Sequence, residues 1–292
     1  MINKKKKTRV FRELLEKDEI LVAPGAYDCV SARIIEHIGF QAVYLSGAGV
    51  SASRIGKPDI GLITMTEQVD QARNIADSVD IPVIADADTG YGNPINVIRT
   101  VKQFEQAGAA AIHLEDQEMP KRCGHMEGKT LISKESMVQK IRAAVDARTD
   151  EDFFIFARTD AKAGYGLDEA IERGKAYVEA GADGIFIEAP ESIEELRIIG
   201  HSFSVPLLVN RPPSKKTPWL SCQELEDLGF KVVIFPGYTN AVVEKALIDV
   251  LTVLKTTGNI TSSYERMLTG EESWKIMGLD YFKTLGKKYG GF

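Results

Sequence analysis

The chain has 292 residues, 44% of them hydrophobic, and a formal net charge of -6 at pH 7. This length and apolar content are typical of a protein that buries a sizeable core, and the acidic balance gives no general attraction to nucleic acid. The apolar runs are too short and too interrupted to span a bilayer, so we expect neither a nucleic acid nor a membrane partner.

The amino-terminal region and the cysteines indicate the compartment. Residues 10–15 have the pattern of an amphipathic helix, and they follow a run of lysines where a secretory signal would carry an apolar segment. The three cysteines, Cys29, Cys123 and Cys222, are widely spaced and odd in number. Such usage is typical of reduced thiols, so we predict a cytoplasmic protein without disulfides.

Short apolar runs alternate with helix-length segments along the chain. Eight runs rich in Val, Ile and Phe predict buried parallel strands, at residues 20–23, 42–45, 82–85, 110–114, 153–157, 184–187, 206–209 and 232–235. Amphipathic segments predict helices, at residues 31–38, 65–78, 93–107, 134–147, 167–180, 192–201 and 221–228. Several of these helices are followed by a glycine that can end them in the left-handed conformation, namely Gly39, Gly108, Gly181 and Gly229.

This alternation predicts an α/β fold, a (β/α)8 TIM barrel. The alternative is an open, doubly wound sheet, which would gather its polar residues at one switch point. Here polar residues follow nearly every predicted strand, which favours the barrel. No change of composition marks a boundary, so we expect a single barrel domain over residues 1–292 with a C-terminal helical extension. That extension begins with a helix over 238–254 and packs on a partner subunit or covers the barrel.

The polar residues at the strand ends point to a metal site. Asp86, Asp88 and Glu115 supply hard oxygen ligands without soft ones, which favours Mg2+, or Mn2+, over zinc. His113 is expected to contact the metal-binding carboxylates without binding the metal itself. The alternative is that the carboxylates cap helices or pair with Arg158.

Other rim residues are suited to an anionic substrate. Arg158 can clamp a carboxylate with two hydrogen bonds, or form a structural pair with Glu188 or Asp160. Ser46, Gly47 and Ala48 follow a strand without the signature of a nucleotide-binding loop, so their backbone N–H groups are expected to receive a carboxylate.

Residues 118–132 form a charged, glycine-containing segment around Cys123 that can close over a site. Lys121, Arg122 and His125 surround the cysteine in sequence, and nearby cations favour a thiolate. This predicts a proton-transferring thiol. The alternative is a cysteine that only packs as a small apolar side chain.

Together these motifs resemble the isocitrate lyase/phosphoenolpyruvate mutase superfamily over essentially the whole chain. The resemblance rests on Tyr44-Leu45-Ser46-Gly47, Lys57-Pro58-Asp59, Asp86-Ala87-Asp88-Thr89-Gly90-Tyr91-Gly92, Glu115-Asp116-Gln117, Lys121-Arg122-Cys123-Gly124-His125 and Ala157-Arg158-Thr159-Asp160. It implies a (β/α)8 barrel whose last helix is swapped between subunits, in a homotetramer built as a dimer of dimers.

The resemblance also implies roles for individual residues. Mg2+ would be held by Asp86 and Asp88, with Asp59 and Glu115 acting near it or through water. A small-molecule carboxylate would be received by Ser46, Gly47, Ala48, Gly124, Arg158, Glu188 and Asn210. The catalytic group would comprise Cys123, Tyr44, Arg158 and His125.

The loop Lys121-Arg122-Cys123-Gly124-His125 is similar to that of the carbon–carbon lyase branch. The implied reaction is a retro-aldol or retro-Claisen cleavage of a 2-hydroxy di- or tricarboxylate of the 2,3-dimethylmalate or 2-methylisocitrate type. A base near Tyr44, or a metal-linked water, takes the hydroxyl proton. The products are a 2-oxo acid such as pyruvate and an enediolate, which Cys123 protonates to a carboxylic acid.

The substrate-facing loops differ from those of 2-methylisocitrate lyases. Asn210 is followed by Arg211-Pro212-Pro213-Ser214, and Gly237-Tyr238-Thr239-Asn240-Ala241 carries no arginine after the eighth strand. This favours a dicarboxylate, unless Arg211 or Arg266 supplies the missing cation. The alternatives are an oxaloacetate hydrolase, a phosphonomutase resembling carboxyvinyl-carboxyphosphonate phosphorylmutase, and a non-catalytic carboxylate-binding barrel.

Overall fold

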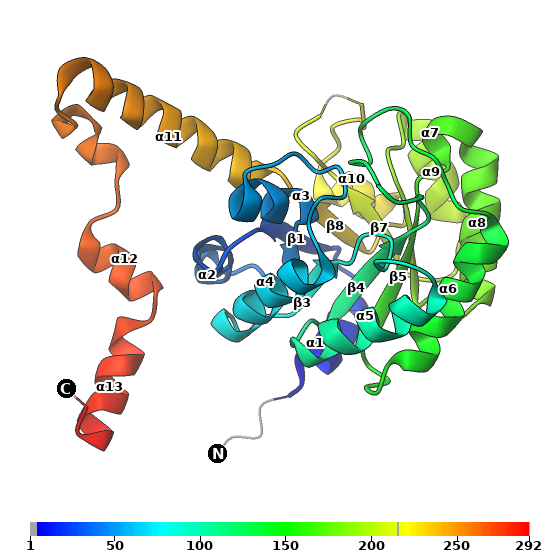
Figure 1. Ribbon diagram of the computed structural model, residues 1–292, viewed down its shortest axis with the longest axis horizontal. Helices are drawn as coiled ribbons and strands as arrows, with labels where there is room; N and C mark the ends of the chain where they lie inside the picture. Colours follow the sequence, from blue (N-terminus) through cyan, green and yellow to red (C-terminus); the bar gives the residue numbers. More distant parts are fainter. Residues whose placement is uncertain (1–4, 215, 292) are drawn as a thin grey trace.

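Eight short parallel strands close into a barrel in the computed structural model, which describes residues 5–214 and 216–291 (Figure 1). The strands pair in chain order, and β8 pairs with β1. They are β1 (Leu21–Ala26), β2 (Val43–Leu45), β3 (Val83–Asp86), β4 (Ala111–Glu115), β5 (Phe154–Thr159), β6 (Gly184–Ile187), β7 (Leu207–Asn210) and β8 (Val232–Phe235). The predicted (β/α)8 barrel is confirmed.

Helices follow the strands and form the outer layer. The main ones are α2 (Cys29–Ile38), α4 (Met65–Ser78), α5 (Pro94–Gln106), α6 (Lys134–Ala147), α8 (Leu167–Glu179), α9 (Ile193–His201) and α10 (Cys222–Asp227). Helix α2 shows how local sequence sets such a boundary. Asp28 and Ser31 form a reciprocal capping box at its start, and Gly39 ends it with a left-handed φ of 103°.

Two apolar layers hold the barrel together. The inner layer fills the barrel with large side chains such as Tyr44, Phe156 and Phe186, and the outer layer lies between strands and helices. Helix α1 (Lys7–Leu15) covers the amino-terminal end of the barrel. Its Phe11 is fully buried, with its ring centroid 5.4 Å from that of Phe154.

Strand register places the polar residues at the carboxyl-terminal end of the barrel side by side on neighbouring strands. Asp86 on β3 pairs with His113 on β4, and Glu115 on β4 pairs with Arg158 on β5. Strand β5 is longer than predicted because Arg158 and Thr159 still pair with β6. The rim residues are therefore fixed by the sheet itself.

The last part of the chain leaves the barrel as a helical arm (Figure 1). It comprises α11 (Tyr238–Thr257), the 3-10 turn Thr261–Arg266, α12 (Gly270–Ile276) and α13 (Leu279–Tyr289). The described part of α11 buries none of its residues. The arm touches the barrel again at α2, where the Arg33 guanidinium donates to the carbonyl of Ile276 at 2.8 and 3.1 Å. Within the described residues, no helix is both long enough and apolar enough to cross a membrane.

Candidate active site

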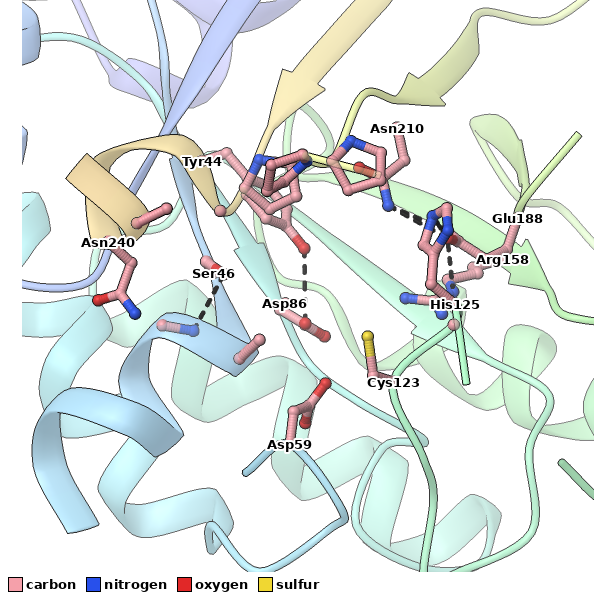
Figure 2. A pocket seen from close by; sticks show the side chains of 18 of the residues that line it. Tyr44, Ser46, Asp59, Asp86, Cys123, His125, Arg158, Glu188, Asn210 and Asn240 are labelled. Carbon is pink, nitrogen blue, oxygen red and sulfur yellow. Dashed lines mark hydrogen bonds and ion pairs between the residues drawn. The ribbon is translucent and has the colours of Figure 1, made fainter. Parts of the chain in front are cut away.

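A cavity of about 270 Å³ opens at the carboxyl ends of the strands, where TIM barrels carry their chemistry (Figure 2). Its polar lining comes from Tyr44, Ser46, Asp59, Asp86, Cys123, His125, Arg158, Glu188, Asn210, Asn240 and Glu244. The rest of its wall is apolar or backbone, from Ala48, Gly49, Gly124, Pro212, Pro213, Pro236, Gly237 and Ala241. This volume lies just below the ~300–1,000 Å³ of drug-sized pockets, so the cavity suits a small acid.

The four acids predicted to surround a metal occupy two layers. Asp59 and Asp86 line the cavity, whereas Asp88 and Glu115 lie behind it and are fully or almost fully buried. Lys121 bridges the layers, since its ammonium lies 2.5 Å from Asp59 Oδ1 and 2.7 Å from Asp88 Oδ1. Asp88 departs from the strand geometry with a left-handed φ of 47°, so its side chain does not continue the alternation of β3.

This acidic end fits a hard divalent cation. Glu115 Oε1 is buried without a hydrogen-bond partner among the described residues, and Oε2 has an ion pair with Arg158 at 3.1 Å. Burial raises the pKa of Glu115 well above the usual range. Burial also raises the pKa of Asp88 to about 6. Within the described ranges, no three His, Cys, Asp or Glu side chains are grouped closely enough to hold a metal alone. Mg2+ suits such a site, because it takes one or two carboxylates and keeps several waters.

Tyr44 projects from β2 into the same end of the cavity (Figure 2). Its hydroxyl lies 2.8 Å from His113 Nε2 and 3.4 Å from Asp86 Oδ2. Burial raises the pKa of Tyr44 well above 10, and burial lowers the pKa of His113 to about 4. Near neutral pH Tyr44 therefore stays protonated and His113 stays uncharged, so the hydroxyl acts as a hydrogen-bond donor and not as a phenolate base.

Arg158 crosses the floor of the cavity between several acids. It donates two hydrogen bonds to Asp160, at 3.0 and 3.1 Å, and its Nη1 lies 3.1 Å from Glu115 Oε2. Its Nε lies 3.8 Å from Glu188 Oε2. Arg158 is therefore structurally paired and also lines the cavity, and its role as a clamp on a substrate carboxylate stays a prediction.

Cys123 points into the cavity from the loop that joins β4 to α6 (Figure 2). Its backbone N–H donates to the Asp59 carbonyl at 3.1 Å, which fixes the loop beside the acids. Burial raises the pKa of the thiol above its usual value. This differs from the thiolate expected from the flanking cations, because Lys121 pairs with Asp59 and Asp88, and His125 Nε2 lies 3.0 Å from Glu188 Oε1.

The remaining predicted substrate residues lie around this centre. Ser46 caps the one-turn helix α3 (Gly47–Val50) by accepting from the Gly49 N–H at 3.1 Å. Asn210 donates to Glu188 at 3.1 and 3.3 Å, which orients the asparagine toward the cavity. Gly47 lies against Asp86, where an added Cβ would come within 2.6 Å of Oδ2 and would have to displace that carboxylate.

The structure brings nearly all the predicted site residues to one cavity, and sequence reasoning missed others. Gly47, Asp88 and Glu115 lie just outside the lining, and all other predicted site residues are in it. The part of the lining to which no role was assigned consists of Gly49, Pro212, Pro213, Pro236, Gly237, Asn240, Ala241 and Glu244. Most of these residues lie in the substrate-facing segments 211–214 and 237–241 that the sequence had singled out, and Pro236 directly follows β8, so the position after two barrel strands was the signal that could have assigned them.

Comparison with known proteins gives a consistent result. The family model of phosphoenolpyruvate phosphomutase matches residues 11–254. The chain is 49% identical to the 2,3-dimethylmalate lyase of Eubacterium barkeri, over 95% of this chain and 96% of that protein. It is 47% identical to the 2-methylisocitrate lyase of Aeropyrum pernix, over 94% of this chain and 88% of that protein.

A solved structure agrees with these relatives. An oxaloacetate acetylhydrolase in complex with the inhibitor 3,3-difluorooxalacetate superposes with a TM-score of 0.94 at 36% identity, covering 98% of each chain. The chain therefore belongs to the isocitrate lyase/phosphoenolpyruvate mutase superfamily that its motifs predicted.

Proposed function

We propose that the protein is a carbon–carbon lyase that cleaves a 2-hydroxy dicarboxylate of the 2,3-dimethylmalate type to pyruvate and a monocarboxylic acid. The prediction of a lyase is confirmed at the level of the family, because relatives matching over most of the chain carry that activity in their names. The observation that carries the proposal is the Cys123 thiol facing the end of the cavity where Asp59 and Asp86 lie, in a buried setting that raises its pKa.

The cation content of the cavity supports a dicarboxylate over a tricarboxylate. Of the described residues, Arg158 is the one arginine or lysine in the lining. Arg211 is turned toward Trp219, with its guanidinium carbon 5.7 Å from the ring centroid. Arg266 is an exposed residue of the arm and pairs with Asp249. Within one chain, neither lies where it could replace the cation that a third carboxylate would need.

The opposite wall supports an alkyl-bearing substrate. Pro212, Pro213 and Pro236 present apolar surface, and Ala241 adds a methyl group. Such a wall favours methyl substituents, because burying an apolar group there removes it from water without leaving a polar group unpaired.

The proposed reaction uses the residues at the two ends of the cavity. Asp86 and Asp59 would hold Mg2+, or Mn2+, with Asp88 and Glu115 behind them. When bound, the cation would supply Lewis-acid polarisation of the 2-oxygen and its neighbouring carboxylate. Arg158 and Asn210 would bind the second carboxylate.

Bond cleavage then separates C2 from C3 of the substrate. The hydroxyl proton passes to a base at the end lined by Tyr44, Asp59 and Asp86, and the electron pair of the C2–C3 bond moves onto the enediolate as C2 becomes a carbonyl. The Tyr44 hydroxyl donates a hydrogen bond at that end. Cys123 gives its proton to C3, with His125 and Gly124 holding the loop that carries the thiol.

We also propose the assembly and the compartment that the motifs imply. Helix α11 leaves the barrel with an exposed apolar face, which supports a swapped helix and a homotetramer built as a dimer of dimers. The three cysteines are free thiols, which supports a cytoplasmic location.

The decisive experiment measures 2-oxo acid release with a lactate-dehydrogenase couple in the presence of Mg2+. The panel holds 2,3-dimethylmalate, 2-methylisocitrate and isocitrate. We expect turnover of 2,3-dimethylmalate, and a loss of about 10²–10⁴-fold in Cys123→Ala, the range of general acid–base catalysis. Cys222→Ala removes a half-buried thiol on α10 and is the matched control, with activity like the wild type. An active Cys123→Ala would contradict the proton-donor role.

Oxaloacetate hydrolysis is the second candidate, favoured by the close superposition on an oxaloacetate acetylhydrolase. Because its products are oxalate and acetate, it needs a direct assay of oxaloacetate loss. Activity on oxaloacetate without activity on 2,3-dimethylmalate would replace the lyase proposal. Phosphonate formation seen by phosphorus NMR and insensitive to Cys123→Ala would instead favour a phosphonomutase.

A further inference from the structure

The loop between β4 and α6 is held down on the rim by its own basic side chains. Lys121 binds two acids of the metal end, and His125 lies against Glu188. The third set of contacts is made by Lys129, which is itself assigned to neither substrate nor metal. It holds the far side of the loop, six residues beyond Cys123.

Lys129 makes two contacts that together close the loop. Its ammonium donates to Asp160 Oδ1 at 3.0 Å and also to the backbone carbonyl of Gly124. The side chain of Lys129 is only 4% exposed although it belongs to a surface loop, and Asp160 is completely buried. One ammonium therefore ties the residue after Cys123 to the end of β5.

Asp160 is shared between this lysine and the substrate-facing arginine. The same carboxylate accepts two hydrogen bonds from Arg158. Burial opposes its charge, but Arg158 and Lys129 outweigh burial and lower its pKa to about 2. Asp160 is also fixed in place, because its backbone N–H donates to the buried Asp116 at 3.0 Å.

This sharing links the cavity to the loop. A carboxylate bound at Arg158 would add a further anion to a guanidinium that already faces Asp160, Glu115 and Glu188, and would weaken its hold on Asp160. Asp160 would then carry more uncompensated negative charge, which would strengthen its existing ion pair with Lys129. Gly124 lies so close to Arg158 that a Cβ on Gly124 would overlap Nη2 of the arginine. A movement of the Arg158 side chain therefore affects where the loop at Gly124 can lie.

We propose that Lys129 is a positioning residue that couples closure of the Cys123 loop to the occupation of Arg158 by a carboxylate. The inference rests on the proposed function for its substrate, but its geometry is independent of the reaction. It assigns Lys129 no contact with the reacting atoms.

The test measures how fast iodoacetamide alkylates Cys123, followed by mass spectrometry of the peptide that contains it. Rates are compared without ligand and with saturating oxalate plus Mg2+. The neutral variants are Lys129→Met, and Lys129→Gln, which keeps a donor for the Gly124 carbonyl. Lys129→Arg restores the charge, and Lys134→Met, at the start of α6 just past the loop, is the matched control. Melting temperatures check that each variant folds.

We expect oxalate to slow alkylation of the wild type by about tenfold, within the 5–150-fold range typical of coupled sites. Both neutral variants should lose this protection, Lys129→Arg should regain most of it, and Lys134→Met should behave as the wild type. The neutral variants should also lower kcat more than they raise KM. Protection retained in both neutral variants, or absent in the wild type, would overturn the inference.

The outcome separates this inference from the proposed function. Alkylation does not require turnover, so a protein that cleaves nothing in the substrate panel but shows Lys129-dependent protection would refute the lyase and leave the coupling standing. Turnover of 2,3-dimethylmalate, together with unchanged protection of Cys123 from alkylation in the neutral variants, would support the lyase and refute the coupling.

Discussion

Cys123 keeps its proton because the cations beside it in sequence are directed to other partners. Lys121 is bound by Asp59 and Asp88, and the carbonyl oxygen of Glu127 accepts a hydrogen bond from Arg122. The thiol is left in a buried environment that disfavours the thiolate. A protonated thiol is the form that an enediolate needs from its proton donor, so the structure supports the predicted role by a different electrostatic route.

The buried His113 predicts a pH dependence of stability. Burial lowers its pKa from 6.5 to about 4, so the unfolded chain binds more protons than the folded one between these values, and stability falls as pH falls. We expect the wild type to lose about 2 kcal/mol more than His113→Gln between pH 7 and pH 5. The measurement is urea unfolding of both proteins at the two pH values and equal concentration.

The comparison with His113→Gln isolates this one group. Gln can still accept from Tyr44, and the raised pKa of Asp88, which acts in the opposite direction over part of this range, is common to both proteins. Equal losses in the two proteins would show that His113 is not buried in its neutral form.

At the scale of elements, close contacts between helices decide where glycine is required. Gly200 lies in α9, and a Cβ there would overlap the carbonyl of Leu228 at the end of α10. We expect Gly200→Ala to destabilise the protein by about 1–3 kcal/mol, as overpacking does. Thermal unfolding followed by circular dichroism measures the change.

Gly164 provides the matched control for this substitution. It lies in the short helix α7 (Lys162–Tyr165), and a Cβ there would meet nothing within 4 Å. Gly164→Ala should therefore be neutral or slightly stabilising, because alanine favours the helix. A loss of stability in Gly164→Ala equal to that in Gly200→Ala would mean that the α9–α10 contact is not the cause.

At the scale of the whole molecule, the helical arm from α11 to α13 packs little against the barrel of its own chain, and no described residue of α11 is buried. Val243, Leu247, Leu251 and Leu254 form an exposed apolar stripe along α11, with side chains 43–56% exposed. Contiguous apolar surface of this kind marks a protein interface. We expect light scattering to give a particle of four times the 32.1 kDa of one chain, in line with the proposed tetramer.

Charges on the stripe should break this assembly. The double variant Leu247→Glu/Leu251→Glu should release smaller species in the same measurement, because each carboxylate would have to be buried at the interface. Thr252→Glu adds one such carboxylate at an exposed position off the stripe and should remain assembled. A wild type that elutes as a monomer, or a double variant that remains a tetramer, would contradict the proposed swap.

The sequence by itself determined the barrel and the membership of most of the site. Periodicity and capping residues are local properties, so they predicted the strands and helices. Motifs at strand ends predicted Asp86, Arg158 and Asn210, and a charged loop predicted Cys123. The short helices α3 and α7 were not predicted, since one helical turn leaves no period to detect. Strand β5 was placed short of Arg158, because only pairing with β6 shows that it continues.

Only the tertiary structure decided which charges meet. Lys121 pairs with Asp59 and Asp88, and Lys129 pairs with Asp160, all from other elements, and no spacing in the sequence specifies those partners. The same holds for the proline wall, which forms where the loops after β7 and β8 face each other. Burial and pairing set the protonation of Cys123, Tyr44 and His113, so the chemistry of the site follows from three-dimensional contacts while its residue types follow from the chain.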